Sequence, residues 1–147
     1  MAVALKLMGE FESHSLTVLR LVAEVADDHP DCDPSLLERA ARARLETAEA
    51  SIRAARKADV AIAAGTDFGG GSGRANHLAW EVEALVEAGL EPWEALGAAT
   101  WRGGELLGEP DAGMVREGGP ADFLLVHGDP TSDPTALWRV WRVVWAD

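Results

Sequence analysis

The sequence predicts an α/β fold, and three observations support this prediction. A long amphipathic pattern covers residues 34–57, and an unbroken apolar run at 60–64 follows it directly. An apolar run without alternation is typical of a strand that is buried on both faces of a parallel sheet. After Pro110 the pattern changes to short segments rich in β-branched and aromatic residues. We therefore expect helices that alternate with buried strands up to about residue 110, and short β-strands beyond it.

The first half of the chain predicts a short strand and two helices. Residues 3–8 have the composition of a strand, and apolar residues at helical spacing predict a helix over 15–26. Asp33 and Pro34 supply an N-cap and a first-turn proline for the next helix. Its apolar residues then recur every three or four positions up to about Lys57, at Leu37, Ala41, Leu45, Ala48, Ile52 and Ala55.

The middle of the chain predicts a loop and three further helices. A glycine-rich loop at 69–73 follows the apolar run. The helices are expected at 78–88, 91–99 and 100–108. Gly89 and Gly108 end the first and the last of them, because glycine readily takes the left-handed conformation that closes a helix. Pro92 suits the first turn of the second helix, and Thr100 can cap the third.

Two strands joined by a turn are predicted near the C-terminus. Residues 123–126 and 139–145 are rich in β-branched and aromatic side chains, and His127 lies in a Gly-Asp-Pro turn at 127–131.

Three tryptophans lie at or near the last predicted strand. Their spacing puts Trp138 on one face of the strand and Trp141 and Trp145 on the opposite face. Tryptophans on two faces make a poor stacking platform for bases or sugars. Packing against a neighbouring domain is therefore the expected role.

Length and charge limit the classes to which the protein can belong. Its 147 residues, 48% of them apolar and 26% charged, suffice for one ordinary globular domain with a sizeable core. The net charge of −12 is uneven: residues 1–58 hold 8 Lys/Arg and 10 Asp/Glu, and residues 59–147 hold 5 and 15. An acidic half repels phosphate groups, which argues against nucleic acid and anionic membranes as partners. A small molecule or another protein remains as the possible partner.

The N-terminal residues and the cysteine count point to a cytoplasmic protein. Residues 1–8 are apolar but too few for an ordinary signal peptide or a membrane span, and they include Lys6. The single cysteine, Cys32, excludes an internal disulfide and a cysteine-based zinc cluster. Its polar surroundings favour an incidental thiol.

The strongest candidate for a site residue is Asp67, which closes the run at 60–67. In parallel α/β folds the chemistry lies at the carboxyl ends of the strands, and Asp67 falls at such an end. A short carboxylate there can bind a metal or accept a proton from an attacking water. Gly65 lets the backbone turn, and the hydroxyl of Thr66 can orient the carboxylate. The alternative is an aspartate that caps the following loop.

Neighbouring motifs resemble other kinds of site but lack residues that those sites require. Asp67-Phe68-Gly69 has the letters of a kinase motif, yet the chain contains no catalytic-loop His-Arg-Asp. The loop at 69–73 could cradle a phosphate, but no Lys-Ser/Thr follows it, so a flexible active-site loop is the better interpretation. Among four scattered histidines, only His77 is placed to contact a substrate. A solvent-exposed histidine at a helix start is the open alternative.

Several segments occur together in an order and spacing typical of one family. The run that ends in Gly65-Thr66-Asp67 is one of them; the others are 48–58, 83–92, 94–100, 106–108, 121–126 and 128–130. With them, the stretch 48–144 resembles the C-terminal part of the metal-dependent amidohydrolase superfamily, in particular its imidazolonepropionase- and prolidase-like members.

The resemblance implies a (β/α)8 barrel with a small β-sandwich appended, which hydrolyses C–N bonds with one or two divalent metals, zinc in particular. Residues 1–112 would be the C-terminal part of the barrel, and 113–147 would be sandwich strands. In this family the aspartate at the end of the eighth strand binds metal and exchanges a proton with the attacking water. Only Asp67 matches it, as a catalytic and metal-binding residue, and His77 is the candidate for substrate binding.

The sequence also departs from the family pattern. The H-x-H motif of the first strand, the bridging Lys or Glu and two later His ligands are absent, together with roughly five barrel strands. The family's frequent Gly-Lys-x-Ala-Asp is replaced by Gly-Gly-Pro-Ala-Asp at 118–122. Since a lone carboxylate cannot hold a catalytic zinc, the other ligands would have to come from outside this chain.

These observations leave two main hypotheses. The first is the C-terminal fragment of an amidohydrolase that cleaves amide or cyclic amide bonds of a small-molecule substrate, with a homo-oligomer or a partner chain supplying the rest of the barrel. The second is a non-catalytic remnant or assembly subunit that associates through its exposed sheet edge, which an open edge and six tryptophans favour. A phosphate-binding module that uses the glycine loop is a weaker third.

Overall fold

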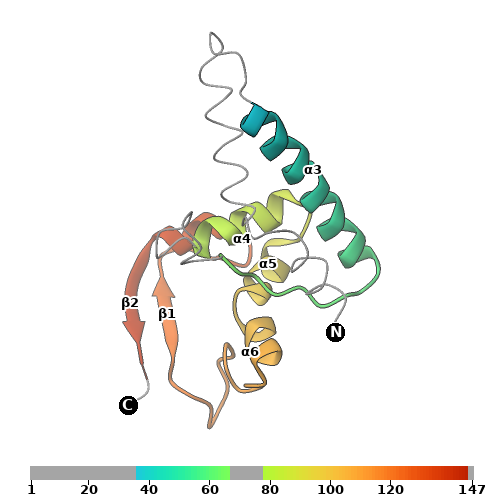
Figure 1. Ribbon diagram of the computed structural model, residues 1–147. Coiled ribbons are helices and arrows are strands. Elements are labelled where there is room, and N and C mark those ends of the chain that lie inside the picture. The colour runs from blue at the N-terminus through green and yellow to red at the C-terminus, as the bar shows by residue number, and fades with distance from the viewer. Residues whose placement is uncertain (1–35, 67–77, 146–147) are drawn as a thin grey trace.

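The computed structural model describes residues 36–66 and 78–145 (Figure 1). The elements in chain order are α3 (Leu36–Lys57), α4 (Leu78–Glu87), α5 (Pro92–Ala98), α6 (Trp101–Leu107), β1 (Phe123–Val126), the 3-10 helix η1 (Pro134–Trp138) and β2 (Val140–Val144). The strand predicted at 3–8, the helix predicted at 15–26 and Cys32 lie outside the described residues. None of the helices described is long and apolar enough to cross a membrane.

Helix α3 confirms the longest predicted helix. Ile52, one of its periodic apolar residues, is buried, while charged residues occupy the exposed side. The end of the helix is attached to the body of the molecule by Arg56. The guanidinium of Arg56 donates to the backbone carbonyl of Gly89 at 2.8 Å, and its Nε lies 2.9 Å from a carboxylate oxygen of Glu94.

The strand predicted at 60–64 is wrong. Residues 60–66 have no regular secondary structure, and Ala61 and Gly65 are exposed. A strand exists only through hydrogen bonds to a neighbouring strand. In the part of the chain that the structure describes, the only sheet is the pair β1–β2, so no strand lies beside this segment. The N–H of Ala64 instead donates to the carbonyl of Ala98, at the end of α5, at 2.8 Å.

Helices α4, α5 and α6 confirm the three helices predicted in the middle of the chain. Gly89 and Gly108 follow α4 and α6 with φ of 112° and 79°, as expected of closing glycines. The predicted cap by the Thr100 side chain is wrong. Its hydroxyl instead donates backward to the carbonyl of Leu96, in the last turn of α5, at 2.8 Å, and makes no side-chain cap bond to α6.

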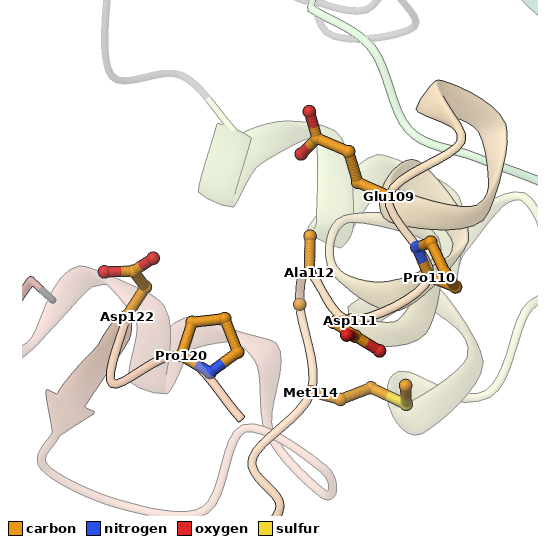
Figure 2. A pocket seen from close by; sticks show the side chains of 8 residues that line it. Glu109, Pro110, Asp111, Ala112, Met114, Pro120 and Asp122 are labelled. Carbon is orange, nitrogen blue, oxygen red and sulfur yellow. The ribbon is translucent and has the colours of Figure 1, made fainter. Parts of the chain in front are cut away.

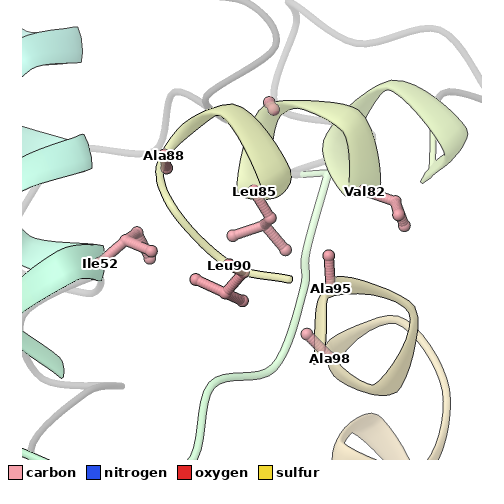
Figure 3. Close-up of a cluster of buried hydrophobic side chains, with 8 residues drawn as sticks. Ile52, Val82, Leu85, Ala88, Leu90, Ala95 and Ala98 are labelled. Carbon is pink, nitrogen blue, oxygen red and sulfur yellow. The ribbon is translucent and has the colours of Figure 1, made fainter. Parts of the chain in front are cut away.

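The hydrophobic core is small and centred on α4 and α5 (Figure 3). Its buried members are Ile52, Val82, Ala84, Leu85, Ala88, Leu90, Ala95 and Ala98. Four of these eight residues are alanines, whose short side chains allow two helices to pack closely. Leu85 is 2% exposed and fills the space between α4 and the chain around Leu90, a burial worth about 2 kcal/mol.

The two C-terminal strands are confirmed and form an antiparallel pair. Phe123 pairs with Val144 and Leu124 with Val143, and the register shifts by one residue before Val126. The turn between the strands begins as predicted at His127, whose N–H donates to the carbonyl of Arg139 at 2.8 Å. Figure 1 shows this ribbon on the side of the molecule away from α3.

The predicted placement of Trp138 on the last strand is wrong. Asp133 accepts a hydrogen bond from the N–H of Thr135 at 3.0 Å and so begins η1, and Trp138 ends that helix. The Trp138 indole packs against Trp80 of α4, with ring centroids 5.2 Å apart, and its N–H donates to the carboxylate of Glu83. Trp138 therefore joins the C-terminal segment to α4 within the chain.

Candidate functional site

Asp67 and His77, the two site residues predicted from the sequence, lie outside the described residues. The structure describes the chain immediately on either side of them. Thr66, half-buried, ends the segment 60–66, and Leu78 begins α4.

The segment 60–66 contacts the core at two of its residues. Ile62 and Ala64 pack on the buried cluster, and the Ala64 N–H is bonded to the end of α5. Figure 1 shows the segment passing from α3 to the underside of α4, and Figure 3 shows it rising past Ala95 and Ala98 toward α4. The segment is thus attached at Ala64 to the end of α5, beside the cluster that α4 also lines.

Helix α4 carries one buried charged residue that the sequence reasoning missed. Glu81 is 1% exposed, and it is the one polar or charged residue among the buried side chains that the structure describes. It lies in the first turn of α4. The signal was available: Glu81 precedes Leu85 by four residues and Ala88 by seven, which places a carboxylate on the apolar stripe of the helix.

A pocket of about 350 Å³ lies elsewhere, between the turn after α6 and the stretch before β1 (Figure 2). It is lined by Glu109, Pro110, Asp111, Ala112, Gly113, Met114, Pro120 and Asp122. Figure 2 shows Glu109 and Asp122 on different sides of it, and Asp111 forms an ion pair with Arg116. Its charged side chains are the carboxylates of Glu109, Asp111 and Asp122, and none of the site residues predicted from the sequence lines it.

The described residues do not hold a metal site by themselves. Within 36–66 and 78–145, no three His, Cys, Asp or Glu side chains gather closely enough to bind an ion. His127 lies in the bend after β1 as predicted, with its ring 6.5 Å from that of Trp141. A divalent metal would need ligands beyond these residues.

Two exposed carboxyl groups in the C-terminal turn have a lowered pKa because neighbouring side chains donate hydrogen bonds to them. The hydroxyls of Thr131 and Ser132 donate to Asp129, and the hydroxyl of Thr135 donates to Asp133. These hydrogen bonds hold the pKa of both carboxyls below the ordinary value. Both aspartates stabilise local turns, and neither faces a pocket that the structure describes.

Comparison with known proteins identifies the family. Residues 8–145 match the model of the Amidohydrolase family. Uncharacterized proteins of Mycobacterium tuberculosis and Mycobacterium bovis are 38% identical over 86 residues, which is 58% of this chain but only 22% of theirs.

The fold has a counterpart among solved structures. The crystal structure of a Xaa-Pro dipeptidase with methionine bound in its active site aligns with a TM-score of 0.70 and 26% identity, over 89% of this chain and 32% of that one. The chain therefore spans about a third or less of the proteins it matches. Because the family model covers nearly the whole sequence, the chain belongs to the amidohydrolase family, the metal-dependent superfamily that the segments around Asp67 predicted.

Proposed function

We propose that this chain is the C-terminal part of an amidohydrolase that hydrolyses amide or cyclic amide C–N bonds of a small-molecule substrate. The family match over residues 8–145 carries the proposal. The likeness to a Xaa-Pro dipeptidase, a protein that acts on a C–N bond, supports the same class of reaction. The chain covers only 32% of that structure, so the activity of the whole enzyme is itself part of the proposal.

In this proposal residues 1–112 belong to a partial (β/α)8 barrel, and residues 113–147 supply strands to a β-sandwich. The order of the described elements supports the division, since helices α3 to α6 come first and the antiparallel pair β1–β2 follows. A homo-oligomer or a partner chain would supply the rest of the barrel.

The proposed site is centred on Asp67. Its carboxylate would be one ligand of a divalent metal, with zinc the expected ion, and would take a proton from the attacking water. The metal, when bound, supplies Lewis-acid polarisation of the scissile carbonyl. His77 would contact the substrate. The described residues add no further ligand set, so the remaining ligands would come from outside residues 36–66 and 78–145.

A comparison of two matched variants tests this proposal. The chain is expressed together with the product of the reading frame directly upstream, which we expect to encode H-x-H, and hydrolysis of Xaa-Pro dipeptides is measured with added Zn²⁺ or Mn²⁺. Asp67→Asn should lower kcat by about 10²- to 10⁴-fold, the range of a lost proton-transfer group. Asp59→Asn is the control, because Asp59 has a φ of 54° in a turn and asparagine tolerates that conformation. Equal activity of the two variants would refute the role of Asp67.

A second function, that of a non-catalytic assembly subunit, is favoured by the exposed apolar surface. Large apolar side chains remain exposed on the ribbon and around α6, among them Leu107, Val115, Leu124, Trp141 and Trp145. Exposed patches of this kind mark surfaces that associate with protein. This function predicts association without hydrolysis: the assembled protein would bind neither Zn²⁺ nor Mn²⁺ and would have no activity.

A further inference from the structure

The C-terminal segment 123–145 packs on the helices mainly through η1. Strands β1 and β2 pair with each other, β1 also packs on η1, and η1 makes the main contact with α4. Within η1, Ala136 is completely buried and Leu137 packs on the hydrophobic core. The Trp138 indole lies against that of Trp80 on α4. The contact is therefore specific, and it depends on a short stretch of the segment.

The stretch 114–122 connects this segment to the helices. All of its residues except Gly119 are exposed, and none of them lies in a helix or a strand. The stretch contains a turn in which the N–H of Gly119 donates to the carbonyl of Arg116 at 3.1 Å. The Arg116 side chain forms an ion pair with Asp111, and both side chains are exposed. Because exposed ion pairs contribute little to stability, the turn can open at small cost.

Gly118 determines whether this turn is closed. Its φ is 75°, in the left-handed region that glycine adopts readily and other residues rarely. A Cβ at this position would have nothing within 4 Å. The backbone conformation, and not the space around it, therefore favours glycine here. If the turn opens, the stretch 114–122 can extend to about 30 Å, which allows the segment to leave α4 of its own chain.

We infer that the stretch 114–122 is a hinge, and that when Gly118 leaves the left-handed conformation the C-terminal segment docks on α4 of a second copy of this chain. Identical chains offer identical docking faces, so the contact between η1 and α4 is the same in the closed chain and in the exchanged dimer. Such an exchange is a low-cost route to a dimer. The two forms differ in the conformation of the hinge and in the freedom that two chains lose on association. Any change that extends the hinge therefore favours the dimer.

Two substitutions of Gly118 test the inference. Both are made together with Trp141→Lys, which removes an exposed ring of the ribbon and so limits association through it. Gly118→Val disfavours the closed turn, because a β-branched residue rarely adopts a positive φ. We expect about a tenfold effect for each of the two hinges, and hence about a hundredfold larger association constant of the dimer. Native mass spectrometry over a range of concentrations measures this constant.

Gly118→Asn is the matched control for this comparison. Asparagine adds a side chain at the same exposed position but tolerates the left-handed conformation. The association constant should therefore stay near that of the chain with Gly118. If Gly118→Val associates no more strongly than Gly118→Asn, Gly118 is not the hinge and the inference is overturned.

A mixing experiment tests whether the dimer exchanges its segments. One Gly118→Val chain also carries Trp80→Ala, and a second one, of different mass, carries Trp138→Ala. An exchanged heterodimer contains one complete contact between Trp80 and Trp138, which neither homodimer has. The ratio of heterodimers to homodimers should therefore exceed that of random pairing about threefold.

The proportion found in the mixture decides between exchange and other kinds of association. Heterodimers at the ratio of random pairing would overturn the exchange. If an alanine variant does not fold, Trp80→Phe and Trp138→Phe replace the two alanine variants, and the same comparison decides. None of these measurements depends on hydrolysis, so a failure of the proposed function is distinguished from a failure of this inference.

Discussion

Gly113 occupies a close backbone approach between the turn after α6 and the start of that helix. Its φ is 74°, and a Cβ at this position would lie 2.4 Å from the carbonyl carbon of Thr100. A side chain would therefore meet backbone that cannot move aside, in a conformation that only glycine adopts readily.

We predict that Gly113→Ala lowers the free energy of unfolding by about 1–3 kcal/mol, from conformational strain and the clash together. Urea denaturation, monitored by circular dichroism, measures this free energy of unfolding. Gly103→Ala is the matched control, because Gly103 lies in α6 with nothing within 4 Å of the added methyl group. The control should gain about 0.5–1 kcal/mol from better helix propensity. A similar loss in both variants would contradict the role of the close approach.

The acidity of Asp129 depends on its hydroxyl donors. The Thr131 hydroxyl donates to Asp129 at 2.6 Å, and this bond is the main cause of the lowered pKa. Thr131→Val should raise the pKa of Asp129 toward its ordinary value and leave that of Asp133 unchanged. Thr135→Val should instead raise the pKa of Asp133 and leave that of Asp129 unchanged. NMR titration of the two carboxyl groups in each variant measures these pKa values.

The sign of the pH effect on stability follows from the lowered pKa. A carboxyl whose pKa is lower in the folded state stabilises the fold above its ordinary pKa, and this contribution disappears as the pH falls through the lowered value. Acid should therefore loosen the turn at 127–133 in the wild-type chain. Thr131→Val should have less of this stability to lose, and an unchanged acid sensitivity would contradict the assignment.

At the scale of elements, α5 depends on a carboxylate shared by two partners. The N–H of Glu91 donates to Glu94 at 2.8 Å at the start of the helix, and the same oxygen pairs with Arg56 of α3. Glu94→Ala should lower the free energy of unfolding by about 1–2 kcal/mol, because it removes a cap as well as an ion pair.

The control for this prediction is Glu105→Ala. Glu105 forms an exposed pair with Arg102 within α6 and caps nothing, so its loss should cost no more than about 0.5 kcal/mol. Thermal unfolding measures the two variants side by side. Equal losses would mean that the Glu91–Glu94 cap contributes little.

The elements that the sequence predicted correctly are those with local signals. Helices α4 to α6 have closing glycines or a first-turn proline, and a few neighbouring residues determine these features. The strand at 60–64 failed because a strand depends on partners far away in the sequence. Trp138 was misplaced because the Asp133 side chain begins a 3-10 helix, a signal that strand composition concealed.

The site was predictable only in part for the same reason. Asp67 could be singled out by its place after an apolar run, but the structure does not describe it. Glu81 was overlooked because its type suggests solvent, although its spacing from Leu85 places it on the buried stripe. Burial of a charge depends on what the tertiary structure places opposite it, and that is not encoded within a few neighbouring residues.

At the scale of the molecule, the ribbon β1–β2 has too little support of its own. Two-stranded ribbons are marginally stable in water, and both Trp141, 66% exposed, and Trp145, 76% exposed, lie on or next to β2. We predict that the purified chain has a native mass above that of one chain, as measured by native mass spectrometry.

Substitution on the ribbon should reverse this association. Trp141→Lys removes an exposed ring without disturbing the core and should shift the population toward single chains. Trp93→Lys, at an exposed site on α5, is the control and should leave the mass distribution unchanged. A folded wild-type monomer would exclude association through this ribbon.

The contact between Trp80 and Trp138 gives the protein a built-in optical probe. The two indoles come from segments far apart in the chain, with centroids 5.2 Å apart and planes at 58°. At that spacing their electronic transitions couple, and the coupling disappears as soon as η1 leaves α4. Near-ultraviolet circular dichroism can therefore follow the attachment of the C-terminal segment without any added label. The variant Trp138→Phe, which lacks one of the two indoles, supplies the reference spectrum without the coupling.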